Sequence, residues 1–207
     1  MNNIKDLNNK VRDLCNFYIV PQWNEKELFL DYTKRVFLFN KDNWWNFLCS
    51  IMDSINDTSF VIEEYKNKWL WSSRWEKLIR LYWLLNAIYC QLTSIEKLEN
   101  ILWLEEKEKP KINKLRKYIT HLSDVDYWKY AYQFTHIIEN DLIIIVEHTN
   151  RNNKLEYNLK ELVDSFEEKI LLRYKKLFEI MLDNVIKFWI NIEEDFKEKI
   201  FKKETSF

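Results

Sequence analysis

The sequence of 207 residues contains no glycine and only two prolines. Walker A loops and dinucleotide-binding turns need glycine, because their backbone adopts positive φ or comes very close to phosphate. The nucleophile elbow of α/β-hydrolases and the glycine-rich loop of kinases need glycine as well. The sequence therefore excludes these classes of nucleotide-binding and hydrolytic site.

An excess of charge of either sign is also lacking, since 32 basic residues face 33 acidic residues and the net charge is −1. Such a protein has no global electrostatic field that would attract nucleic acid or an anionic membrane. Any binding of a polyanion must therefore come from a local cluster of basic residues.

Signals for export and for membrane insertion are missing. The first residues contain no apolar stretch of the kind found in signal peptides, and no apolar run exceeds five residues, as in residues 142–146. The three cysteines, Cys15, Cys49 and Cys90, are far apart, which favours buried thiols in a reducing compartment. We therefore expect a cytoplasmic protein without a membrane partner.

Apolar residues recur every three or four positions through most of the chain, which is the spacing of amphipathic helices. In the segment rich in tryptophan we expect Ile79, Trp83, Ala87 and Cys90 to form the buried stripe. The most regular pattern follows Asn158 and predicts one helix of about 40 residues. The expected helices cover residues 4–18, 25–39, 43–55, 60–92 with a break near 72–73, 93–108, 111–120, 127–140 and 159–199.

Two local patterns mark expected helix starts, and one marks expected strands. Thr93 with Glu96 and Asn158 with Glu161 have the spacing of N-terminal capping boxes. Residues 142–146 are rich in isoleucine, and residues 154–159 follow after a polar stretch, which is typical of a hairpin. The sequence therefore predicts an all-α helical bundle with a long C-terminal helix and at most one small β-hairpin near 142–159, built as a single domain over residues 1–207.

Few residues are suited to metal binding or proton transfer, because the chain has only three histidines. His136 and His148 have no cluster of polar residues beside them, so packing or surface roles are the simplest interpretation. The sequence has no Cys-x-x-Cys and no His-x-x-x-His spacing. We therefore predict neither a metal nor another cofactor.

His121 differs from the other two histidines because a basic segment precedes it. Residues 107–117 contain six positive charges and one negative charge, and Arg116 lies five positions before His121. Basic side chains hold phosphate, and an imidazole moves protons near neutral pH. The pattern indicates cleavage of a phosphodiester in RNA, and the simpler alternative is a solvated basic helix that contains a histidine.

An all-helical chain with Arg116 and His121 in an R-x4-6-H motif resembles the HEPN superfamily. The sequence from the motif to Asp126 is similar to that of the toxin members of this superfamily. The resemblance implies a HEPN-like domain that acts as a metal-independent endoribonuclease of a toxin or phage-defence type. It implies that the active site forms where two protomers of a homodimer meet. An antitoxin or another protein is a further expected partner.

The hypothesis of RNA cleavage gives individual residues expected roles. Arg116 and His121 would be catalytic, the arginine stabilising charge on the phosphorane and the histidine transferring protons. Single-stranded RNA would be held by the lysines of the same segment, and the imidazole would be oriented by an aspartate that follows it. The binding residues expected are Lys111, Lys114 and Lys117, and the orienting residues are Asp124 and Asp126.

The alternative is a catalytically inactive helical module that binds proteins. Lys117 stands where active HEPN proteins commonly have Asn, Asp or His after the arginine. Ten tryptophans are more than a core of this size needs, so some of them are candidates for a protein interface. A C-terminal membrane anchor is disfavoured, because residues 193–198 include four acidic residues. The interface candidates are Trp44, Trp45, Trp69, Trp71 and Trp75.

Overall fold

The computed structural model describes residues 3–20, 23, 28–39, 44–68, 73–104, 111–120, 132–139, 142–147 and 154–188. The predicted all-α class is confirmed, and one small antiparallel sheet accompanies the helices. The helices are α1 (Ile4–Asp13), the π-helix η1 (Leu14–Ile19), α2 (Phe29–Phe37), α3 (Trp44–Lys68), α4 (Arg74–Ile101), α5 (Lys111–Thr120) and α6 (Leu159–Phe188). The strands are β1 (Tyr132–Glu139), β2 (Leu142–Glu147) and β3 (Lys154–Asn158).

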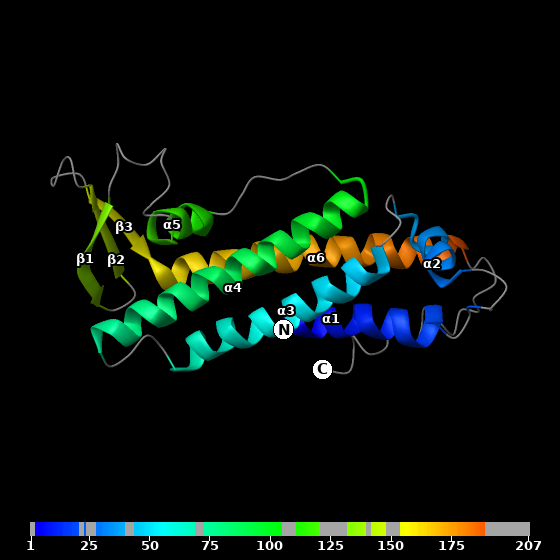
Figure 1. Cartoon of the computed structure of the whole chain (residues 1–207), viewed down its shortest axis with the longest axis horizontal. Coiled ribbons are helices and arrows are strands. Elements are labelled where there is room, and N and C mark those ends of the chain that lie inside the picture. The colour runs from blue at the N-terminus through cyan, green and yellow to red at the C-terminus, as the bar shows by residue number, and fades with distance from the viewer. Residues whose placement is uncertain are drawn as a thin grey trace.

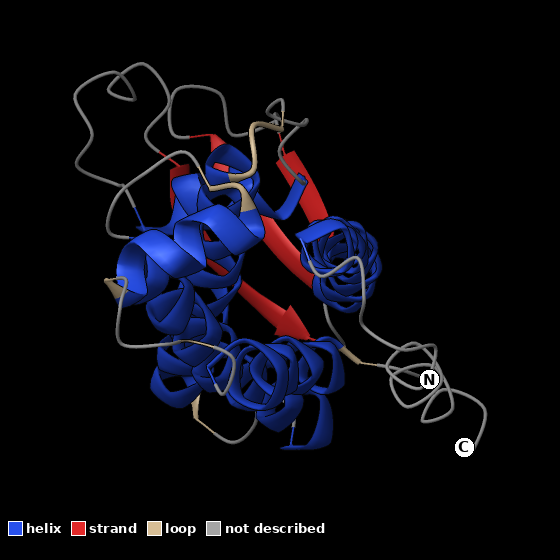
Figure 2. Ribbon diagram, turned by 90° about the vertical axis from the view of Figure 1, so that its right-hand side faces the viewer, coloured by secondary structure: helices blue, strands red, loops and turns tan. Residues whose placement is uncertain are grey.

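The long helices α4 and α6 run along the length of the molecule and cross each other (Figure 1). Helix α3 packs against α4, and α1 packs against both α3 and α6. Helix α2 lies at one end of the bundle, and the sheet and α5 lie at the other (Figure 1). In the view along the long axis the strands lie behind the helices (Figure 2). The sheet therefore extends one end of a helical bundle.

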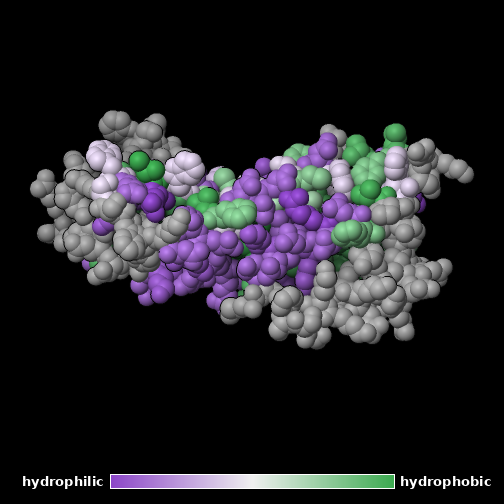
Figure 3. Space-filling model, turned by 90° about the horizontal axis from the view of Figure 1, so that it is seen from below, coloured by the Kyte–Doolittle hydropathy of each residue, from purple (hydrophilic) through white to green (hydrophobic). Residues whose placement is uncertain are grey.

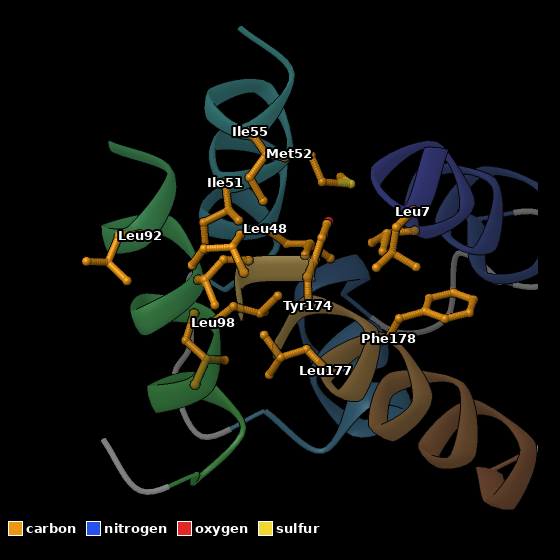
Figure 4. Close-up of a cluster of buried hydrophobic side chains, with 14 of the residues drawn as sticks. Leu7, Leu48, Ile51, Met52, Ile55, Leu92, Leu98, Tyr174, Leu177 and Phe178 are labelled. Atoms are coloured by element: carbon orange, nitrogen blue, oxygen red, sulfur yellow. The ribbon is translucent and has the colours of Figure 1, made fainter. Parts of the chain in front are cut away.

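One hydrophobic cluster includes residues of every described helix. Figure 4 shows its centre, where Leu7 of α1, Leu48 of α3 and Leu177 of α6 point toward a common space. A buried polar contact joins the same helices: the Tyr174 hydroxyl donates to Asn8 Oδ1 at 2.8 Å, and Asn8 Nδ2 donates to the Met52 carbonyl at 2.8 Å. These bonds fix the alignment of α1 against α3 and α6, because each buried polar group would otherwise lose its hydrogen bond.

The face of the molecule in Figure 3 carries a broad band of hydrophilic side chains across its middle. This is the outer side expected of amphipathic helices whose opposite sides form the core. Within the described residues, no helix combines the length and the apolarity required to cross a bilayer.

Polar side chains cap the free backbone N–H groups at the starts of α4 and α6. Asn158 Oδ1 accepts from the Glu161 backbone N–H at 3.1 Å, and its Nδ2 donates to the Glu161 side chain, which confirms the predicted cap of α6. Ser73 accepts from the Glu76 N–H at 3.2 Å and caps α4, which confirms the break near 72–73. Helix α6 has 30 described residues, and the remainder of the predicted length lies outside the described residues.

The predicted helix start at Thr93 is wrong, because α4 continues through it to Ile101. Leu92, Ile95 and Leu98 on either side of Thr93 are all buried, with at most 1% of each exposed. Their burial along one continuous face outweighs the local preference for a cap.

The predicted buried stripe of this segment is also wrong, since Ile79, Trp83 and Cys90 are exposed and only Ala87 is buried. The core side of α4 is formed instead by Leu81, Leu84, Leu85 and Ile88. Both sides of the segment carry apolar residues at helical spacing, so periodicity alone does not choose between them. The prediction of buried thiols is confirmed for Cys15, whereas Cys49 is half-buried and Cys90 is exposed.

The predicted hairpin is present as β2 and β3, which pair antiparallel with Ile143 opposite Tyr157. A helix over 127–140 is wrong for the described part, because β1 pairs antiparallel with β2 and Phe134 lies opposite Ile145. The sheet thus has three strands in the order β1-β2-β3. Pairing with the isoleucine-rich β2 stabilises the extended form of a segment whose apolar residues also suit a helix.

Among the described residues, two helix ends have a left-handed residue, and the chain has no glycine to supply one. Leu38 after α2 has φ 58°, and Trp103 after α4 has φ 62°. At the end of α4 the Leu104 N–H donates to the Glu99 carbonyl at 2.9 Å, and the Trp103 N–H donates to the Asn100 carbonyl at 3.3 Å. This is a Schellman motif with tryptophan in the place of glycine, which costs roughly 1 kcal/mol of backbone strain.

Candidate functional site

Helix α5 carries the basic residues singled out in the sequence, and its apolar side attaches it to the bundle. Ile112 and Leu115 are buried, and α5 packs against α4 and α6. Their spacing of three residues places both on one side of the helix. The ten residues of α5 include four basic residues and no acidic residue. Lys111 at the first position is exposed.

Arg116 is the predicted catalytic arginine, and the structure places it against Tyr89 of α4. The centre of the guanidinium lies 3.5 Å from the centroid of the Tyr89 ring, and Arg116 is half-buried. Cations are attracted to the face of an aromatic ring, most strongly where water is excluded. A guanidinium can lie on an aromatic face and still offer N–H donors at its edge to a carboxylate or a phosphate.

The other predicted site residues are described only in part. Lys114 and Lys117 are residues of α5, and their side chains lie outside the description. His121, Asp124 and Asp126 lie outside the described residues, as does the pairing of Arg116 with His121. The structure thus brings Arg116 and Lys111 together on one helix.

Tyr89 was not among the residues expected from the sequence. It lies on a different helix from Arg116, and no motif links the two positions. The sequence around Tyr89 is rich in aromatic residues, and nothing in it indicates that this tyrosine contacts an arginine of a later helix. Only the packing of α5 on α4 brings the ring beneath the guanidinium.

A buried ion pair joins α4 and α6, the two helices on which α5 rests. Arg173 Nε donates to Glu99 Oε1 at 2.9 Å, and Arg173 Nη2 donates to Glu99 Oε2. The side chains are 7% and 4% exposed. A bidentate pair fixes direction as well as distance, so it holds α4 and α6 in one alignment.

The tryptophans expected at a protein interface are in different surroundings. Trp44 is fully buried against Phe37 and Phe39, so it is not an interface residue in this fold. Trp45 is half-buried, and Trp69 and Trp71 lie outside the described residues. Trp75 is 73% exposed.

An exposed apolar stripe on α4 consists of Trp75, Ile79 and Trp83, which are 73%, 54% and 67% exposed. Their spacing of four residues places them along one side of the helix. The two indoles alone expose roughly 300 Å², given that an aromatic side chain has about 150–250 Å² to bury. An apolar patch of that size on a monomer is often functional.

Metal ligands do not gather within the part of the chain that the structure describes: no three His, Cys, Asp or Glu side chains lie close enough together to hold an ion. The comparisons find no matching family model, no similar curated protein and no similar solved structure. The features of α5 that bear on function are the spacing of Arg116 and His121, the positive charge of the helix and the contact of Arg116 with Tyr89.

Proposed function

We propose that the protein is a metal-independent endoribonuclease that acts on single-stranded RNA as a homodimer. The observation that supports this proposal is the stacking of Arg116 on Tyr89 within a helix of four basic and no acidic residues. A stacked guanidinium is held in position before the substrate arrives, so it stabilises developing charge with little reorganisation. Membership of the HEPN superfamily, with a role in toxin–antitoxin systems or phage defence, is part of the same proposal.

The proposed reaction needs no group from outside the RNA and the protein. The 2′-hydroxyl of the RNA attacks the adjacent phosphorus while His121 takes up its proton. The bond from phosphorus to the 5′-oxygen breaks, and that oxygen receives the proton that His121 took up, which leaves a 2′,3′-cyclic phosphate and a 5′-hydroxyl. Arg116 stabilises the negative charge on the phosphorane, Lys111, Lys114 and Lys117 hold the backbone, and Asp124 or Asp126 orients the imidazole.

The test is cleavage of single-stranded RNA in EDTA. We expect Arg116→Ala and His121→Ala each to lower the rate by about 10²- to 10⁴-fold. Arg80→Ala is the matched control, because Arg80 is also a half-buried arginine but pairs with Glu76 on α4. A substrate with 2′-deoxyribose at the cut position should resist. Full activity in His121→Ala would reject the mechanism.

Tyr89 is a positioning residue in this proposal. Tyr89→Ala should lower the rate roughly two- to fivefold, since an exposed cation–π contact is worth about 0.5–1 kcal/mol. Tyr89→Phe keeps the ring face and should restore the wild-type rate. Equal losses in both variants would show that the hydroxyl, and not the stacking, matters.

The dimer is proposed to form through residues 115–128, where Tyr127 and Trp128 supply aromatic anchors. Sedimentation equilibrium at micromolar concentration should then show a dimer. A monomer throughout that range would contradict the composite site.

The second candidate function is a protein-interaction module without activity, and the exposed stripe of Trp75, Ile79 and Trp83 favours it. Ile79→Glu would place a charge in the middle of this stripe. If the wild-type protein cleaves no RNA and Ile79→Glu abolishes its self-association, the module is the better account. If Ile79→Glu leaves both cleavage and dimer unchanged, the stripe plays no part in either.

A further inference from the structure

The exposed stripe of Trp75, Ile79 and Trp83 lies on the side of α4 directly opposite the core. Ile88 is buried and lies nine positions after Ile79, which is about 180° around an α-helix. The stripe is therefore not the margin of the hydrophobic core. It occupies the first half of α4, which begins at the end of the molecule that carries the sheet (Figure 1). An apolar surface in such a place is typical of an interaction site.

The stripe has the same order of residues in both directions along the helix. One tryptophan stands four positions before Ile79, and another stands four positions after it. A two-fold interface requires a surface that complements itself. When two copies of α4 pack antiparallel with the two-fold axis at Ile79, each Trp75 lies opposite the partner's Trp83, and the two isoleucines meet at the axis.

The charges beside the stripe are self-complementary in the same arrangement. Glu76 and Arg80 form an ion pair of 2.7 Å on α4, and both side chains are 40% exposed. They lie on one side of the stripe, about 60° and 100° around the helix from Ile79. Antiparallel packing brings each Glu76 to within about 3 Å, measured along the helix axis, of the partner's Arg80. Parallel packing would place the two ion pairs on opposite sides of the interface, where neither meets the other.

The area of the stripe suits a weak dimer. The tryptophans of two copies together would remove roughly 600 Å² from water, and Ile79 and the residues that border the stripe add to this area. Stable interfaces bury about 1,200–2,000 Å², and transient ones bury less. We therefore expect two copies to associate more weakly than at micromolar concentration.

We propose that the protein self-associates through this stripe, with two α4 helices packed antiparallel and Ile79 at the two-fold axis. Burial of the four indoles drives the association, and the Glu76–Arg80 pairs select the antiparallel direction. This interface is separate from the dimer through residues 115–128. It rests on the interaction-module candidate, whose partner it identifies as a second copy of this chain, and it does not depend on RNA cleavage.

The experiment is disulfide trapping of the full chain, at concentrations well above micromolar and with Cys90→Ser as the background because Cys90 is exposed. Ile79→Cys places two thiols at the axis, where helices 8–10 Å apart have Cα atoms about 5 Å apart, within the range of a disulfide. Asn86→Cys is the matched control. Asn86 is exposed on the same side of α4, but its two copies would lie about 20 Å apart.

Under mild oxidation we expect Ile79→Cys to form a covalent dimer at least about tenfold faster than Asn86→Cys, as followed on non-reducing gels. Equal rates would overturn the proposal, because random collision or parallel packing brings both positions together. A failure of Ile79→Cys to crosslink would overturn it too, and would mean that the stripe has another occupant or none. Crosslinking without RNA cleavage would count against the ribonuclease alone, and cleavage without crosslinking would count against this interface alone.

A charge exchange tests the direction of packing. In the Ile79→Cys protein at low salt, Glu76→Arg should slow crosslinking by about fivefold or more, because it brings like charges together across the interface. Adding Arg80→Glu restores opposite charges and should restore the rate. Circular dichroism checks that each variant keeps its helices. A loss that the second change does not repair would overturn the antiparallel arrangement.

Discussion

Breaking the ion pair between Glu99 and Arg173 should be among the most destabilising single changes in the protein. Glu99→Gln leaves the guanidinium of Arg173, 7% exposed, without its counter-ion. Removing one partner of a buried pair costs about 3–5 kcal/mol, because the remaining charge keeps its desolvation penalty. The total free energy of unfolding of a domain is about 5–15 kcal/mol, so a large share of it would be lost.

The measurement is urea unfolding followed by circular dichroism, with Glu76→Gln as the control. Glu76 forms an ion pair with Arg80 at 2.7 Å, but both side chains are 40% exposed, so its loss should cost only about 0.3–0.5 kcal/mol. The double variant Glu99→Leu with Arg173→Met should recover most of the stability, because it removes both charges. A cost below about 1 kcal/mol for Glu99→Gln would refute the reasoning, since it would mean that water solvates Arg173.

Three further predictions concern pH, capping and salt. Burial, with a smaller contribution from Cys49, raises the pKa of Cys15, so above about pH 8.5 the thiol ionises in the unfolded chain and stays protonated in the fold. The free energy of unfolding should therefore fall as the pH rises, and it should fall less steeply in Cys15→Ala. Urea unfolding at several pH values measures both. Asn158→Ala should cost about 1 kcal/mol in the same assay, since it removes the cap of α6. Lys111→Glu should weaken binding of single-stranded RNA, as followed by fluorescence anisotropy. The slope of the logarithm of the binding constant against the logarithm of the salt concentration should become shallower by about 0.7 for each phosphate that the protein no longer neutralises. An unchanged slope would mean that the RNA site lies away from α5.

The parts of the fold that the sequence predicts well are those set by local chemistry. The cap at Asn158, the break before Ser73 and the hairpin of β2 and β3 each depend on neighbouring residues, and all three are present. The errors arise where distant contacts decide. Residues 132–139 form a strand because β2 is there to pair with them, and α4 continues through Thr93 because its core side stays buried.

For the candidate site, too, the sequence predicts the local features and misses the contacts between helices. The sequence predicts a basic helix with Arg116 on it, and the structure has that helix as α5. It does not predict Tyr89 beneath Arg116, because that contact joins residues of different helices. The sequence prediction of which side of α4 is buried is wrong, since apolar residues occupy both sides and periodicity alone does not choose between them.

The contact between α1 and α6 has a consequence for synthesis on the ribosome. Leu7 and Asn8 are made early, but their partners on α6, such as Tyr174, are made near the end. At roughly 5–20 residues per second, several seconds pass between the completion of α4 and that of α6. Throughout that interval the nascent chain exposes the apolar sides of α1, α3 and α4 that α6 later covers. We therefore expect the nascent chain to be prone to aggregation until α6 has been made.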